Sequence, residues 1–175
     1  MSGRSRAAQR TQLATVLLVG EGHAEVALLH HLKTLYAPRG CGLAVTIKNA
    51  HGKGASHVVD YAIRQARNAA FDHKLALLDA DTDWSAKVQT QASQGGIHVV
   101  ACEPCLEALL LSVHGALRAG RSPAQLKRDF LARFGVQAHE RDLYAAQFPR
   151  ERLELARHTV GGLDQLLKAF STPMR

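Results

Sequence analysis

Apolar positions along the chain alternate between short continuous runs and stretches with helical spacing. The runs are rich in Val, Leu and Ile and have the length of buried strands: residues 16–19, 43–47, 75–78 and 97–101. Between them, apolar residues recur every three or four positions, as in 24–36 and in 57–69, which Ser56 can cap. Strands that alternate with helices predict a single α/β domain, with a mainly parallel sheet of about four strands and flanking helices.

The second half of the chain reads as helical. We expect a short helix over 84–93 and an apolar helix that Glu103 and Pro104 open and that runs to about Leu117. Further helices are predicted at 123–134 after a Ser122 cap, at 150–159 and at 163–170. We therefore divide the 175 residues into a basic flexible arm (1–12), an α/β domain (13–117) and a basic helical extension packed on the same domain (118–175).

Charge is distributed unevenly along the chain. The net charge is +7, and residues 118–175 carry eleven Lys or Arg against six Asp or Glu. Such an extension can attract a polyanion, although solvated helix faces explain the same composition equally well. No apolar run approaches the roughly 20 residues of a membrane-spanning helix. We expect a cytoplasmic protein that does not contact a membrane.

Three cysteines are too few for a disulfide framework. Cys102 and Cys105 have the spacing of a redox pair or of half a zinc site, but no second paired motif of matching spacing supplies the remaining zinc ligands. We interpret the two as buried apolar thiols.

Acidic residues follow the first and the third apolar run. Glu21 and Glu25 come after the first run, and Asp79, Asp81 and Asp83 come after the third. Because the carboxyl ends of parallel strands line one crevice, we expect these side chains to meet there. Carboxylate oxygens suit Mg²⁺ or Mn²⁺. The alternative is that Asp-x-Asp at a strand end is only a turn or a helix cap.

The turn Gly20-Glu21-Gly22 also opens like a dinucleotide-binding loop. That motif needs a third glycine where this chain has Glu25, and Glu21 would place negative charge beside a pyrophosphate. A nucleotide-binding oxidoreductase is therefore the weakest of the functional hypotheses.

Residues 14–105 resemble the Toprim domain of topoisomerases, bacterial-type primases, OLD-family nucleases and recombination proteins. The two matching motifs are Gly20-Glu21-Gly22-His23-Ala24-Glu25 and Asp79-Ala80-Asp81-Thr82-Asp83. The resemblance implies that Glu21 acts as acid or base and that Asp79 and Asp81 bind the metal, with Asp83 at the place of a third acid. Glu25 is a further candidate metal ligand.

A second resemblance is to the small RloB-like proteins of restriction and phage-defence neighbourhoods. It lies in the glycine-rich loop 51–54, in the Asp-x-Asp strand and in the segment 103–114, which is similar to their Pro-x-Phe-Glu-x-x-Leu-Leu-x-His pattern. Here Leu106 replaces the aromatic residue and one extra residue precedes His114. Glu107 and Lys53 are additional site candidates, although an ion-paired Glu107, a core His114 and a solvated Lys53 are the simpler interpretations.

These observations predict a Mg²⁺- or Mn²⁺-dependent phosphodiester-processing enzyme, a hydrolase of nuclease type that acts on DNA or RNA in defence or repair. Basic residues of the extension are predicted to contact the nucleic acid: Arg121, Lys127, Arg128 and Arg133. The alternative is a non-catalytic module of the same fold that binds nucleic acid or a partner protein of a defence or repair system. The sequence makes no prediction of oligomeric state.

Overall fold

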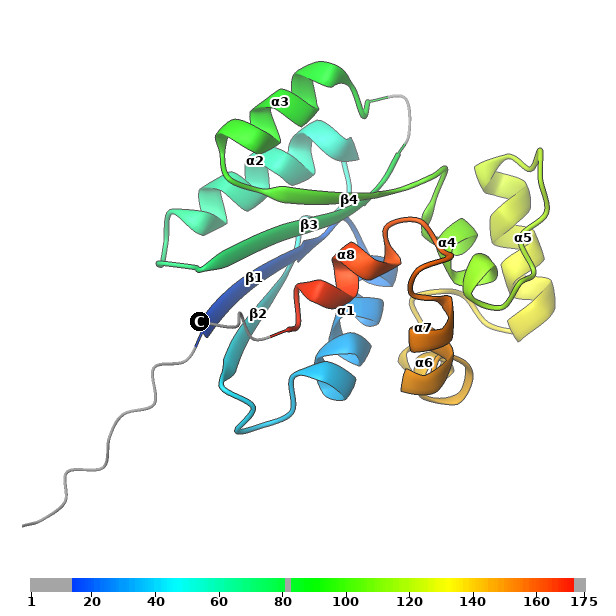
Figure 1. Cartoon of the computed structure of the whole chain (residues 1–175). Helices are drawn as coiled ribbons and strands as arrows, with labels where there is room; N and C mark the ends of the chain where they lie inside the picture. The colour runs from blue at the N-terminus through cyan, green and yellow to red at the C-terminus, as the bar shows by residue number, and fades with distance from the viewer. Residues whose placement is uncertain (1–13, 81–82, 172–175) are drawn as a thin grey trace, which may run out of the picture.

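Four parallel strands form the centre of the molecule (Figure 1). The structure is a computed structural model that describes residues 14–80 and 83–171. The strands are β1 (Ala14–Gly20), β2 (Leu43–Asn49), β3 (His73–Asp79) and β4 (His98–Cys102). Their order in the sheet is β2-β1-β3-β4, and all three neighbouring pairs are parallel. The predicted α/β fold with a parallel sheet is confirmed.

Helices cover both faces of the sheet. α2 (Gly54–Ala66) and α3 (Ala86–Gln94) pack on one face, and α1 (His23–Tyr36) packs on the other (Figure 1). Successive residues of β1 alternate between the two hydrophobic layers: Leu17 belongs to the α2 side and Leu18 to the α1 side. Both side chains are almost fully buried, which is why the strand reads as a continuous apolar run and not as an alternating one.

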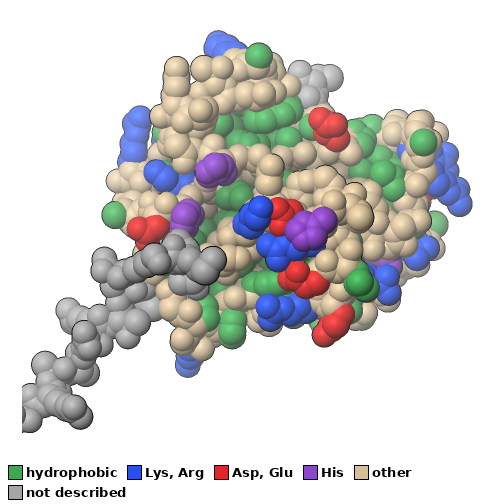
Figure 2. All heavy atoms as spheres, viewed as in Figure 1, with side chains coloured by type: hydrophobic (Ala, Val, Ile, Leu, Met, Phe, Trp, Pro, Cys, Tyr) green, Lys and Arg blue, Asp and Glu red, His purple; other side chains and the backbone are tan. Residues whose placement is uncertain are grey.

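The C-terminal region is helical and shares the hydrophobic layer of α1. It contains α4 (Leu106–Val113), α5 (Pro123–Phe134), α6 (Arg141–Gln147), α7 (Arg150–Ala156) and α8 (Leu163–Lys168). Tyr144 and Phe148 are completely buried against this layer. The outer surface of α7 and α8 carries a mixed cluster of charges, in which Arg157 pairs with Glu154 and Asp164 (Figure 2). No helix among the described residues is long and apolar enough to cross a membrane.

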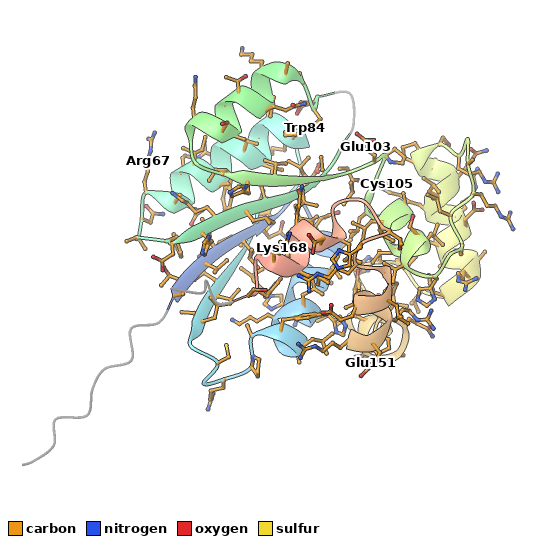
Figure 3. The ribbon with its side chains drawn as sticks, in the orientation of Figure 1. Arg67, Trp84, Glu103, Cys105, Glu151 and Lys168 are labelled. Carbon is orange, nitrogen blue, oxygen red and sulfur yellow. The ribbon has the colours of Figure 1, made fainter. Side chains whose placement is uncertain are left out.

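α4 and α2 begin at residues other than those predicted from the sequence. α4 begins at Leu106, with Cys105 as its N-cap, so Glu103 and Pro104 precede the helix (Figure 3). The backbone N–H of Leu106 donates to Asp79, and this long-range bond marks the true start of α4. α6 was not predicted; unlike α7, which follows Pro149, and α8, which follows Gly162, it has no proline or glycine at its N-cap to mark its start. The predicted basic arm, 1–12, lies outside the described residues.

α2 begins three residues before its predicted start, and Ser56 is not its N-cap. The N-cap position is Lys53, and Oδ2 of Asp83 accepts a hydrogen bond of 2.9 Å from the backbone N–H of Ser56. A carboxylate 27 residues away in the chain thus accepts a hydrogen bond from a backbone N–H group at the start of the helix. In many helices the acceptor is a capping side chain close in sequence.

Gly54 is the residue that lets Asp83 approach α2. Its φ is +83°, and an added Cβ would lie 2.5 Å from Oδ2 of Asp83. We expect Gly54→Ala to lose stability from both the backbone conformation, roughly 1–2 kcal/mol, and the clash. Gly52→Ala is the matched control, because Gly52 has a φ of +78° and no atom within 4 Å of the added carbon. Thermal denaturation should show a clearly larger fall in melting temperature for Gly54→Ala; equal falls would contradict the proposed clash.

Candidate functional site

A cleft of about 550 Å³ lies at the carboxyl ends of the strands. One wall is built from the turn after β1, the end of β3 and the first turns of α1 and α4; the other is built from α5 and the segment that follows it. Figure 1 shows the strands of the sheet directed toward α4 and α5. The lining residues are Glu21, Gly22, His23, Ala24, Glu25, Gly52, Asp79, Glu107, Lys127, Arg128, Phe130, Leu131, Gln137, Ala138 and His139.

Glu21 and Asp79 are brought together by the pairing of β1 with β3. Gly20 lies opposite Leu77 in the sheet, and the backbone N–H of Glu21 donates to the carbonyl of Leu77 over 3.0 Å. The backbone N–H of Asp79 in turn donates to Oε2 of Glu21 over 3.0 Å. Oδ1 of Asp79 accepts from the backbone N–H of Leu106 over 2.8 Å. Two carboxylates from distant segments are therefore fixed side by side.

Glu25 joins this cluster from the first turn of α1. Its Oε2 accepts a hydrogen bond of 2.8 Å from the backbone N–H of Gly22, and the side chain is only 7% exposed. α1 can come this close to β1 because residue 20 has no side chain: a Cβ on Gly20 would lie 2.9 Å from Cγ2 of Val26. The glycine thus has a packing role that the sequence does not reveal.

Glu107 is the fourth carboxylate of the cluster. It lies in the first turn of α4, is 9% exposed and accepts a hydrogen bond from the thiol of Cys105. Glu107 was an additional site candidate in the sequence, and it lines the same cleft as Glu21 and Asp79.

The four carboxylates create a strongly negative environment. Burial raises the pKa of Asp79 to about 7; the charges of Glu25, Glu21 and Glu107 add to the rise, and the hydrogen bond from Leu106 opposes it. Burial also raises the pKa of Glu25, with smaller contributions from Glu21 and Glu107. Among residues 14–80 and 83–171, none of the four forms a salt bridge with Lys, Arg or His. A bound cation would relieve this repulsion.

The donor atoms of this cluster are carboxylate oxygens, the type that a hard divalent cation prefers. Glu21, Glu25 and Asp79 each use an oxygen to accept a backbone N–H, which orients the carboxylate and leaves lone pairs for a cation. In the described part of the chain, however, no group of three or more His, Cys, Asp or Glu side chains is placed so that it could hold a metal ion. Mg²⁺ commonly binds through one or two carboxylates, with waters and substrate phosphates as its other ligands.

Two further site candidates, Asp83 and Lys53, do not line the cleft. Asp81 is outside the described residues. Asp83 lies at the start of α2, where it accepts the hydrogen bond from Ser56, and it is not among the described residues that line the cleft. Lys53 is exposed, has a φ of +76° and likewise does not line the cleft.

The four predicted nucleic-acid contacts are separated by the structure. Lys127 and Arg128 of α5 line the cleft opposite the carboxylates. Arg121 instead forms two hydrogen bonds with Asp129, of 3.0 and 3.1 Å. The guanidinium of Arg133 lies 5.7 Å from the centre of the Phe134 ring, and Arg133 is not among the described lining residues. The cleft therefore combines an acidic wall with a basic one.

His114 packs against aromatic rings, and Cys102 and Cys105 are buried beside the carboxylate cluster. His114 Nε2 makes a hydrogen bond of 2.8 Å with the carbonyl of Gln147, and its ring packs edge-on against Phe148. Both thiols are at most 2% exposed; burial raises the pKa of Cys105 to about 12 and that of Cys102 well above its ordinary value. Protonated, buried thiols match the interpretation of the pair as apolar core residues.

Several lining residues were not predicted from the sequence. His23, Gln137 and His139 contribute polar groups, and Leu131 contributes an exposed apolar side chain. His23 lies within the same motif as Glu21, and this position in the sequence could have identified it as a lining residue. The segment 137–139 lies between α5 and α6 in the chain, and no local pattern marks it as part of the cleft.

Comparisons of the chain with protein family models, with curated proteins and with solved structures find no match.

Proposed function

We propose that this protein is a divalent-metal-dependent, phosphodiester-processing enzyme of Toprim type, and specifically a nuclease. The observation that carries the proposal is the meeting of Glu21, Glu25, Asp79 and Glu107 in one cleft whose opposite wall holds Lys127 and Arg128. Catalysis of phosphoryl transfer requires mainly that the phosphate be positioned and its charge neutralised. A cleft with both carboxylates and cations contains groups for each task.

The acidic wall supplies the groups that act on the reacting phosphate. Asp79, with Asp81 as its predicted partner, would hold Mg²⁺ or Mn²⁺, and Glu25 and Glu107 add negative charge that favours the cation. When bound, the metal would neutralise phosphate charge and polarise the attacking water. Glu21 is the proposed general base: the backbone N–H of Asp79 holds one of its oxygens, which fixes the carboxylate toward the cleft.

The basic wall supplies the contacts that hold the substrate. Lys127 and Arg128 are exposed and project from one turn of α5 into the cleft. Their charges would pair with phosphates on either side of the reacting one. The pair can thus keep a polyanion in a cleft whose other wall would repel it when metal-free.

Cleavage assays test the proposal directly. Labelled single-stranded and duplex DNA and RNA should be cut in Mg²⁺ or Mn²⁺ and left intact in EDTA. Melting temperature measured in parallel should rise with either metal, because a ligand that binds only the folded state stabilises it. Absence of cleavage with every substrate, together with a melting temperature that ignores both metals, would contradict the enzyme and leave the alternative of a module that binds nucleic acid or a partner protein.

A further inference from the structure

Leu131 is a large apolar side chain left 44% exposed inside the charged cleft. It follows Lys127 by four residues and Arg128 by three, so the three share one side of α5. The buried side of the helix is formed instead by Leu126 and Phe130, which are 1% exposed. The basic wall therefore presents two cations and an apolar surface together.

Nucleic acid offers the same combination, provided that its bases are unpaired. Each nucleotide of a single strand carries a phosphate next to a base whose flat apolar face is open to contact. In a duplex the base faces are stacked on one another, and only phosphates and groove edges reach the surface. An exposed leucine beside two phosphate contacts thus gains little from duplex and much from a single strand.

The size of the cleft also favours an unpaired strand. A volume of about 550 Å³ lies in the range of pockets that enclose small organic ligands, roughly 300–1,000 Å³. Such a space holds a nucleotide unit, whereas a double helix could only lie across its mouth. Gln137 and His139 line the same wall and can bond to base edges that pairing would otherwise occupy.

We infer that the cleft binds single-stranded nucleic acid, with its phosphates on Lys127 and Arg128 and a base against Leu131. This inference rests on the proposed function only in taking nucleic acid as the ligand. It assigns to Leu131 the discrimination between unpaired and paired substrate, and it does not depend on cleavage.

The test measures binding in Ca²⁺ by fluorescence anisotropy, with a labelled single-stranded oligonucleotide and a blunt duplex of the same sequence. The wild-type protein should prefer the single strand. Leu131→Ser should weaken binding of the single strand about fivefold, as expected for a partly buried leucine, and leave duplex binding nearly unchanged. Leu155→Ser is the matched control, since Leu155 on α7 is 85% exposed and is not among the described lining residues.

A second variant separates the cations from the leucine. Lys127→Ser combined with Arg128→Ser should weaken binding of both probes and lower the slope of log affinity against log salt by about 0.7 for each lost single-strand contact. This charge variant should retain the wild-type preference for the single strand. Leu131→Ser should lose the preference for the single strand and retain the wild-type slope of log affinity against log salt.

The inference and the proposed function fail in different ways. Duplex binding as tight as single-strand binding, a preference that survives Leu131→Ser, or no binding of either probe would each overturn the inference. Cleavage of duplex and single-stranded substrates with equal efficiency would overturn the inference and support the proposed nuclease activity. Preferential binding of the single strand without any cleavage in Mg²⁺ or Mn²⁺ would support the inference and exclude the proposed nuclease activity.

Discussion

Glu21→Gln should lower the rate of strand cleavage by about a hundredfold or more, the usual scale for loss of a general base. Glutamine keeps the side-chain oxygen that accepts the backbone N–H of Asp79, so the turn after β1 should retain its conformation. It cannot take a proton from the attacking water. The loss should therefore appear in the turnover rate, measured at saturating substrate, and affinity for the oligonucleotide should change little.

Glu103→Gln is the matched control for this experiment. Glu103 is exposed, lies just after β4 and is not among the described residues that line the cleft, so the variant removes one acid from the same edge of the sheet (Figure 3). It should cleave at the wild-type rate. If Glu21→Gln also cleaves at that rate, another group takes the proton; if it loses the melting-temperature response to Mn²⁺, Glu21 is a metal ligand and not mainly a base.

The arrangement of the sheet was predictable because its strands are encoded locally. Each strand is a short apolar run, and alternation with helices implies parallel pairing. From that follows the meeting of Glu21 with Asp79, since the carboxyl ends of neighbouring parallel strands share an edge. α5 was also predictable, because Ser122 and Gln125 form a local capping box and Gly135 follows its last turn.

Features that depend on distant partners were not predictable. The start of α2 depends on Asp83, and the start of α4 depends on Asp79; both bonds join residues 27 positions apart. Neither leaves a local pattern. Asp83 follows an Asp-x-Asp strand, a position that is equally compatible with a metal ligand. The sequence therefore does not reveal that Asp83 accepts a hydrogen bond from the backbone of Ser56.

The roles of the basic residues in and beside α5 were also not predictable from the sequence. Composition groups Arg121, Lys127, Arg128 and Arg133 together, yet only the packing of the helix shows that Lys127 and Arg128 line the cleft. Arg121 is held by Asp129, eight residues away, which no charge count reveals. Leu131 directly follows the buried Phe130 in the sequence, yet the fold leaves it exposed in the cleft.

The acidic wall carries a stability cost that a single substitution should remove. In the metal-free protein, folding raises the pKa of Asp79 from about 3.8 to about 7, so the folded state holds a proton that the unfolded state releases between these values. The unfolded state then binds fewer protons, and stability falls as the pH rises through this window. The main cause of the raised pKa is burial of Asp79, and the charges of Glu25, Glu21 and Glu107 add to it.

Asp79→Asn should therefore melt at a higher temperature than the wild-type protein at pH 8 in EDTA, by several degrees, and the difference should shrink as the pH falls toward 4. Asparagine keeps an oxygen for the backbone N–H of Leu106 and its volume is nearly that of aspartate. Comparison of the two proteins at each pH cancels the titrating groups that do not act on Asp79, such as His30 and His114 with their lowered pKa values. Glu25, whose charge acts on Asp79, titrates together with it and belongs to the measured difference. In Mn²⁺ the order should reverse, because the wild-type protein gains stability from the metal and the variant does not. A variant that is less stable than wild type at pH 8 in EDTA would show that Asp79 serves mainly to hold α4, and an unchanged response to Mn²⁺ would show that it is not a metal ligand.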